Sequence, residues 1–139
     1  MEGAPDSWQQ WLEIQDLYTR YFAALDDGPA EQWVNCFTED GVLETPSLGI
    51  LGAGRAALAG WIKGYHESWA NDEQRRHMLT NLSFNVHGDN ATGSCYLTAY
   101  HCRAGKANIG VVGYYRDRLV KVSGAWRFSY RLVVVDGQG

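Results

Sequence analysis

The spacing of apolar residues changes once along this chain, near His77, and that change limits the folds open to it. Before His77, apolar side chains recur every three or four residues, as on one face of a helix. After it they alternate with polar neighbours, as along a strand with one buried face. We therefore predict a single α+β domain over residues 1–139, with N-terminal helices packed on one face of an antiparallel sheet.

Three segments carry the helical spacing. The first covers about residues 8–25, ends before Gly28-Pro29, and is expected to be covered along its apolar stripe. That stripe consists of Trp8, Trp11, Leu12, Leu17, Tyr18, Tyr21, Phe22 and Leu25. A short second helix is predicted near residues 33–37. A third begins at Arg55, on the spacing of Leu58, Trp61, Ile62, Tyr65 and Trp69.

The residue pattern in the second half of the chain predicts a meander of long strands. Residues 78–86 alternate until Gly88-Asp89-Asn90, which has the composition of a hairpin turn. Strands are then predicted over residues 91–102, 109–120 and 126–135. Earlier in the chain, residues 42–44 predict a short strand, and the glycines of 49–54 indicate a loop or hairpin.

Aromatic residues are more numerous than a core of this size needs. The chain has six Trp and eight Tyr, and 13% of its residues are aromatic. Some are expected to line one apolar pocket for a small organic molecule, although ordinary core packing is the alternative for each. The candidates for the pocket wall are Tyr18, Trp33, Phe37, Trp61, Tyr65, Trp69, Tyr96 and Tyr114.

Charge and motif content argue against several classes of protein. The net charge is −4 and the basic residues are dispersed, so nucleic acid is not an expected partner. The apolar run 132–135 is far too short for a membrane helix. Three cysteines without CxxC spacing, and no apolar leader, predict a reduced, cytoplasmic protein. We expect no metal and no cofactor, because neither metal-ligand spacing nor a nucleotide fingerprint is present.

Six short runs occur in the order known from one family. They are Ile14–Tyr18, Tyr21–Asp26, Cys36–Gly41, His77–Asn81, Gly88–Gly93 and Gly124–Phe128. Together they resemble the SnoaL-like proteins of the nuclear transport factor 2-like superfamily, over nearly the whole chain. The resemblance implies a cone formed by a strongly curved sheet and three helices, with a central pocket between them.

The resemblance also implies candidate catalytic residues. Bile-acid dehydratases and the hexachlorocyclohexane dehydrochlorinase pair an Asp with a His at the places that match Asp26 and His77. The dehydratases add a Tyr, which falls on Tyr21. They also carry an acidic group near Ala99, which this chain lacks. The family includes isomerases, polyketide cyclases, small dioxygenase subunits and non-catalytic domains, so the fold alone does not choose a reaction.

These residue types suit proton abstraction next to a carbonyl. Imidazole takes up a proton near neutral pH, and a carboxylate behind it fixes its tautomer. Tyr21 would donate a hydrogen bond to the substrate oxygen. The alternatives are an ordinary strand histidine at His77, a helix-end residue at Asp26 and a core aromatic at Tyr21.

Two geometric conditions follow for this triad. Tyr21 and Asp26 point about 140° apart on an ideal helix, so the helix must end near Leu25. On an unbroken strand His77 shares its face with Leu79 and Asn81, opposite to the apolar face, so a β-bulge must turn His77 inward.

The predicted function is that of a cofactor-independent lyase or isomerase, a dehydratase or cyclase for an apolar, carbonyl-bearing or polycyclic metabolite. One alternative is a non-catalytic domain that carries a ligand or stabilises a partner enzyme. Another is a cyclase that works mainly by folding its substrate. Apolar residues on both faces of 126–135, together with the habit of the family, predict a homodimer.

Overall fold

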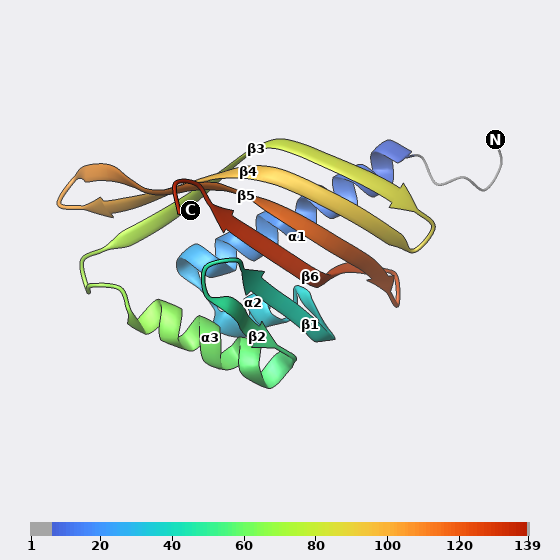
Figure 1. Ribbon diagram of the computed structural model, residues 1–139, viewed down its shortest axis with the longest axis horizontal. Coiled ribbons are helices and arrows are strands. Elements are labelled where there is room, and N and C mark those ends of the chain that lie inside the picture. The colour runs from blue at the N-terminus through green and yellow to red at the C-terminus, as the bar shows by residue number, and fades with distance from the viewer. Residues whose placement is uncertain (1–6, 139) are drawn as a thin grey trace.

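Two helices open the chain in the computed structural model, which describes residues 7–138, and a short pair of strands then precedes the third helix and the four long strands (Figure 1). The helices are α1 (Ser7–Asp27), α2 (Ala30–Val34) and α3 (Arg55–Glu67). The strands are β1 (Phe37–Thr45), β2 (Gly49–Ala53), β3 (Gln74–His87), β4 (Asn90–Arg103), β5 (Lys106–Val122) and β6 (Ala125–Val135). This order confirms the predicted α+β class.

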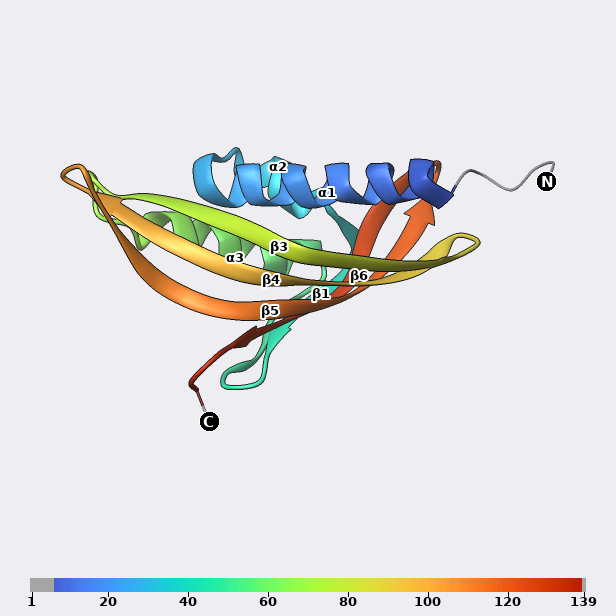
Figure 2. The same cartoon turned by 90° about the horizontal axis from the view of Figure 1, so that it is seen from above.

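The strands form one six-stranded sheet in the order β2-β1-β6-β5-β4-β3. All neighbouring strands are antiparallel except β1 and β6, which pair in parallel, so the expected antiparallel sheet needs correction at this pair. The sheet is curved, and α1 lies above it alongside β3 (Figure 2). Because β3 is an edge strand, the seam between α1 and β3 opens to solvent.

Burial along α1 follows the helical spacing. Its middle and last turns face the sheet, and there Ile14, Leu17, Tyr18, Tyr21, Phe22 and Leu25 are buried. Burying one large apolar side chain contributes about 2 kcal/mol, so this stripe holds the helix in place. The first turns differ from the prediction, because Trp8 is 64% exposed and Leu12 is 50% exposed.

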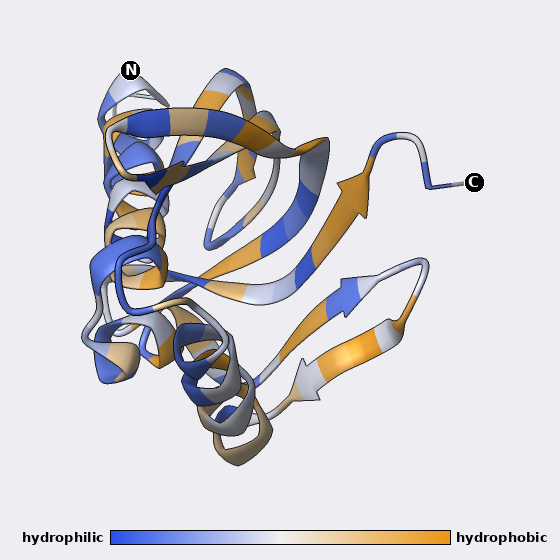
Figure 3. Cartoon of the chain, turned by 90° about the vertical axis from the view of Figure 1, so that its left-hand side faces the viewer, coloured by the Kyte–Doolittle hydropathy of each residue, from blue (hydrophilic) through white to orange (hydrophobic). Residues whose placement is uncertain are grey.

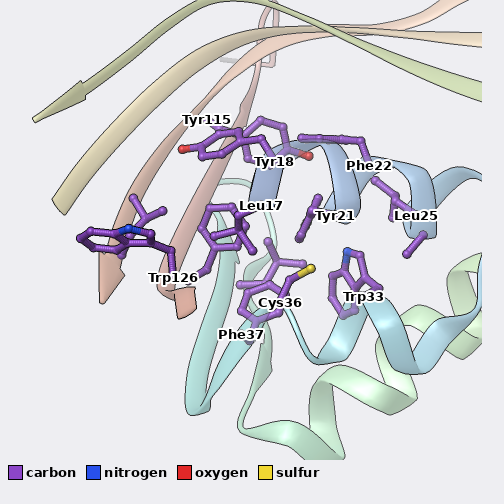
Figure 4. Close-up of a cluster of buried hydrophobic side chains, with 14 of the residues drawn as sticks. Leu17, Tyr18, Tyr21, Phe22, Leu25, Trp33, Cys36, Phe37, Tyr115 and Trp126 are labelled. Atoms are coloured by element: carbon purple, nitrogen blue, oxygen red, sulfur yellow. The ribbon is translucent and has the colours of Figure 1, made fainter. Parts of the chain in front are cut away.

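The core fills the space between the helices and the sheet. Tyr21, Trp33 and Phe37 turn toward one another there (Figure 4), with ring centroids 4.9 to 5.8 Å apart. On α3, Leu58 and Ile62 are fully buried. Stretches of β3, β4 and β5 alternate between more and less buried residues as predicted, whereas the end of β6 is continuously apolar (Figure 3). None of the helices described combines the length and apolar character that crossing a membrane requires.

A β-bulge changes the face of β3. The pairing with β4 shifts between Thr80 and Ser83, and Asn81 has a positive φ of 55°. Before the bulge His77 and Leu79 face α1, and after it Leu82 and the following alternate residues do. The bulge that the sequence required is therefore present. The expected end of α1 near Leu25 is wrong, because the helix continues to Asp27.

Candidate active site

Asp26 and His77 meet at the seam between α1 and β3. The Asp26 Oδ1 and His77 Nδ1 atoms are 2.5 Å apart, and Asp26 Oδ2 accepts a hydrogen bond of 3.0 Å from the His77 backbone N–H. Two contacts from one carboxylate fix both its own orientation and that of the ring. Because an ionised carboxylate can only accept, the neutral imidazole carries its proton on Nδ1.

The pair lies at the wall of a cleft of about 320 Å³. The His77 side chain is 6% exposed and that of Asp26 is 8% exposed, so both are shielded from bulk water. The cleft is lined by Gln15, Tyr18, Thr19, Phe22, Ala23, Asp26, His77, Leu79 and Leu82. No hydrogen bond to His77 Nε2 is found within residues 7–138. That nitrogen is therefore the ring atom left for a ligand.

Helical geometry decides which tyrosine lies near the pair. Asp26 follows Phe22 by four residues and Tyr18 by eight, so the three share a face of α1. Tyr21 lies on a different face, is 1% exposed and packs 5.4 Å from Trp33, centroid to centroid. The structure does not place Tyr21 in the lining of the cleft. The reason is that α1 continues through Asp26, so the two side chains keep their divergence.

A second ion pair is sealed beneath the same helix. Arg131 Nε and Nη2 donate to the Asp117 carboxylate at 2.7 and 2.9 Å, and both side chains are fully buried. The Tyr18 hydroxyl donates to the same carboxylate. Burial opposes the charge of Arg131, but Asp117, together with Tyr21 and Tyr18, more than offsets it and raises the pKa of Arg131 well above its ordinary value.

Aromatic rings enclose the Arg131 guanidinium. Its Cζ lies 4.0 Å from the ring centroids of Tyr115 and Phe128 and 4.3 Å from that of Tyr21. These rings supply cation–π attraction at a site that bulk solvent does not reach, since the Arg131 side chain has no exposed surface. Burial raises the pKa of Tyr21 well above the usual range, so its phenol stays neutral. Arg131 and its aromatic neighbours form a closed box.

Sequence reasoning missed both members of this pair. Strict alternation places Arg131 on the outer face with Arg127, but the pairing of β5 and β6 shifts between Arg118 and Leu119, which leaves Ser129 as an extra residue on β6. The shift turns Arg131 inward. A second enabling feature is Gly93, where a Cβ atom would lie 2.5 Å from the Tyr18 hydroxyl oxygen. Neither feature has a signal in one sequence.

The other proposed wall residues lie outside the lining of this cleft. Trp33 and Phe37 are fully buried in the core. Trp61 stacks on Tyr65 with centroids 5.1 Å apart on α3, and Trp69 follows them. For Trp33, Phe37, Trp61 and Tyr65 the structure favours the core-packing alternative, and Trp69 is half-buried beside Tyr65.

Tyr96 and Tyr114 need a correction, because they lie on the face of the sheet that points away from α1. Their neighbours Cys95 and Tyr115 are buried on the inner face, and alternation places the two tyrosines outside. Tyr96 is 58% exposed. Together the two line a separate hollow of about 290 Å³ on the outer face. Aromatic content alone could not tell one face from the other.

Metal ligands were also sought. Within the part of the chain that the structure describes, no group of three or more His, Cys, Asp and Glu residues has the arrangement of a metal site. The polar groups that the cleft lining contributes include the His77 imidazole, the Asp26 carboxylate, and the side chains of Gln15 and Thr19.

Comparison with known proteins places the chain in a family. Residues 7–132 match the model of the SnoaL-like domain, and this chain belongs to that family. It is 33% identical to Rv3472 of Mycobacterium tuberculosis, a protein of unknown function. That match covers 98% of this chain and 78% of the other, with a TM-score of 0.86.

Two further relatives carry more information. A structure from Catenulispora acidiphila, in complex with S-DNPA, is 28% identical, with a TM-score of 0.85 over 95% of this chain and 97% of the other. The anthranilate 1,2-dioxygenase small subunit of Burkholderia cepacia is 26% identical over 149 residues, which covers 98% of this chain and 92% of the relative. The chain is thus similar both to a protein whose structure holds a small molecule and to the small subunit of an enzyme.

Proposed function

We propose that this protein is a cofactor-independent lyase or isomerase, of the dehydratase or cyclase type, in which His77 acts as a general base. The observation that carries the proposal is the 2.5 Å contact between Asp26 and His77 Nδ1 at the wall of an accessible cleft. This contact leaves Nε2 with its lone pair. A base fixed in one tautomer, and largely shielded from water, is what proton abstraction next to a carbonyl requires.

The chemistry would proceed in two proton transfers. His77 Nε2 takes the proton from the carbon next to the carbonyl, and the electron pair of that C–H bond moves to the carbonyl oxygen as an enolate. The imidazolium is stabilised by Asp26. For a dehydration it then returns the proton to a departing hydroxyl group as the enolate collapses, and water leaves. For an isomerisation the proton returns to another carbon.

The substrate oxygen needs a hydrogen-bond donor. Tyr21 lies outside the cleft lining, and the Tyr18 hydroxyl already donates to Asp117. The Thr19 hydroxyl donates to the Gln15 backbone oxygen at 3.1 Å. The Gln15 side-chain amide is the remaining neutral donor in the lining, but Gln15 precedes Asp26 by eleven positions, or roughly 16 Å along the helix, so we assign no donor to the substrate oxygen.

Proton exchange tests the base without knowledge of the natural substrate. Methyl ketones are incubated in D₂O, and loss of the α-proton signal is followed by NMR. We expect the protein to accelerate exchange and the His77→Gln variant to lose that acceleration by about 100-fold or more. His87→Gln, the same substitution at an exposed position of the same strand, is the matched control and should keep the rate. Equal rates in both variants would sink the proposal.

The dioxygenase small subunit supports one alternative, a non-catalytic domain that stabilises a partner enzyme or carries a ligand. Such a domain would bind ketones without accelerating exchange, and His77→Gln would leave binding intact. A cyclase that acts only by folding its substrate would also show no exchange, but it would convert a linear polyketide. The ketone measurement therefore separates the base-catalysed reaction from the other two.

The expected homodimer is retained as a proposal. On the outer face of the sheet Tyr96 is 58% exposed and Val112 is 45% exposed, and pairing through this face would cover them. Light scattering on the protein and on Tyr96→Glu tests this. A dimer that dissociates in the variant supports pairing through this face, and a monomeric wild type rejects it.

A further inference from the structure

The seam between α1 and β3 continues beyond the cleft into a second hollow. This hollow has a volume of about 580 Å³, and it is lined by Ser7, Trp8, Trp11, Leu12, Phe84 and Val86. Among the described residues that line it none is charged, and Ser7 is the one that is polar. The cleft, in contrast, contains Asp26, His77, Gln15 and Thr19. One seam therefore has a reactive polar end and an apolar end.

The two hollows lie along one continuous surface. On α1 the residues that line them are spaced by three or four, from Trp8 and Leu12 through Gln15 to Asp26, and so share a face. On β3 the bulge at Asn81 brings the alternate residues of both halves to the same side.

A pair of rings joins the hollows. Tyr18 lines the cleft and Phe84 lines the apolar hollow, and their ring centroids are 5.2 Å apart. The Trp11 centroid is 4.9 Å from that of Phe84 on the other side. These ring contacts place the two hollows next to each other along the seam.

Exposure at the apolar end indicates that a ligand is to be bound there. Trp8 and Leu12 are at least half exposed, and Trp11 is only partly buried. Water against this much aromatic surface is unfavourable, by roughly 25 cal/mol for each Å² that a ligand would cover. The hollow also falls within the size range of small-molecule sites, about 300–1,000 Å³.

We propose that the hollow is the second half of the substrate groove and holds the apolar end of an elongated carbonyl compound. The carbonyl end rests on the proposed function and lies at His77. From Asp26 to Leu12 is fourteen positions, or roughly 21 Å at the helical rise. From His77 to Phe84 is seven positions on an extended strand, or roughly 23 Å. The substrate class is thus a long-chain ketone or acyl compound with an extended skeleton of about 20 Å.

Chain length is the variable that tests this groove. A series of methyl ketones of about six to sixteen carbons is titrated, and binding is followed by intrinsic tryptophan fluorescence and calorimetry. While the chain extends along the groove, the dissociation constant should fall about fourfold for each added methylene. Leu12→Asp should weaken the longest ketones by at least about tenfold and leave the shortest unchanged, because a carboxylate in the hollow opposes burial of the chain end.

The matched control is Leu48→Asp, which places the same charge at a position that is 77% exposed in the turn between β1 and β2. It should keep the wild-type dependence on chain length. The groove proposal is overturned if the dissociation constant does not change with chain length in the wild type. It is also overturned if the dependence on chain length is unchanged in Leu12→Asp. A dimer seen by light scattering that Leu12→Asp dissociates also overturns it, since a second copy would then occupy the hollow.

The groove proposal and the general-base proposal can be rejected independently of each other. If His77→Gln loses proton exchange but the wild type shows no chain-length dependence, the base stands and the groove is wrong. If the chain-length dependence is present and Leu12→Asp reduces it, but the wild type shows no proton exchange, the groove stands as that of a carrier and the base is wrong. Binding is measured directly, so neither result depends on turnover.

Discussion

Two pairs of opposite charge type lie against α1, one Asp–His and one Asp–Arg, and they differ in access as well as in chemistry. Asp26 holds His77 at the open edge of the sheet, where β3 has no further neighbour. Asp117 holds Arg131 in the middle of the sheet, between β5 and β6, inside a box of aromatic rings. In both pairs one carboxylate makes two contacts with its partner. At the edge, the pair also borders a cleft.

The difference separates a candidate catalytic pair from a structural one. Arg131 and Asp117 are fully buried, and no ligand reaches them without opening of the core. A sealed ion pair gives little net stability, but loss of one partner leaves an uncompensated charge. The side chain that connects the two regions is Tyr18, which lines the cleft with its ring and donates to Asp117 with its hydroxyl.

The largest expected effect is on stability, at the sealed pair. Asp117→Asn removes the charge that faces Arg131, and we expect the free energy of unfolding to fall by about 3–5 kcal/mol. Urea denaturation measures this. The double variant Asp117→Leu with Arg131→Met should recover much of the loss, because no unpaired charge remains. A single variant within about 1 kcal/mol of the wild type would show that the pair is not sealed.

A substitution in the Asp26–His77 pair should lower the rate of proton exchange and have little effect on stability. In Asp26→Asn the amide can donate to Nδ1, which favours the tautomer with the proton on Nε2. We expect proton exchange from methyl ketones to slow by about 100-fold or more. The melting temperature should change by only a few degrees, since the pair lies at the edge. Proton exchange at the wild-type rate in this variant would show that the Asp26 carboxylate does not assist the base.

The link between the two regions should show an intermediate effect. Tyr18→Phe removes one of the donors to the buried Asp117 carboxylate, and we expect a loss of about 2 kcal/mol in the free energy of unfolding. Tyr21→Phe, its neighbour in the box without a bond to Asp117, serves as the matched control. If both variants lose the same stability, then Tyr18 makes no special connection.

The smallest expected effect concerns the access of a reagent to the cysteine thiols. Burial raises the pKa of the Cys36 thiol to about 11 and that of Cys95 to about 12. Below those values both remain protonated and unreactive, since the thiolate is the nucleophile. Iodoacetamide at mildly alkaline pH should therefore label the partly exposed Cys102 first, as seen by mass spectrometry. Early labelling of Cys95 would mean that the core opens.

The order of elements could be predicted from periodicity, and the position of the open pair from the family resemblance. Helical spacing marked the buried turns of α1, and alternation marked the long strands. The parallel pairing of β1 with β6 could not be foreseen, because it joins segments distant in the sequence. The sequence showed that His77 needed a bulge, yet the one at Asn81 carries no distinctive residue.

The burial of the Arg131–Asp117 pair could not be predicted, because it depends on which residues of β6 point to the inner face of the sheet. One extra residue in β6, Ser129, reverses the faces that follow it and buries Arg131. The same dependence explains Tyr96 and Tyr114, whose composition suited a pocket wall but whose register places them outside. A single sequence gives the residue types of a strand more securely than it gives the side to which each points.

The position of the proton on the His77 ring is the most direct test of whether His77 acts as a general base, because a base at the cleft requires an unprotonated Nε2. Long-range proton–nitrogen correlation NMR on ¹⁵N-labelled protein distinguishes the two tautomers. We expect a proton on Nδ1, held by Asp26, and an unprotonated Nε2 whose resonance shifts when a methyl ketone is added. A neutral ring with its proton on Nε2, unaffected by the ketone, would contradict this expectation.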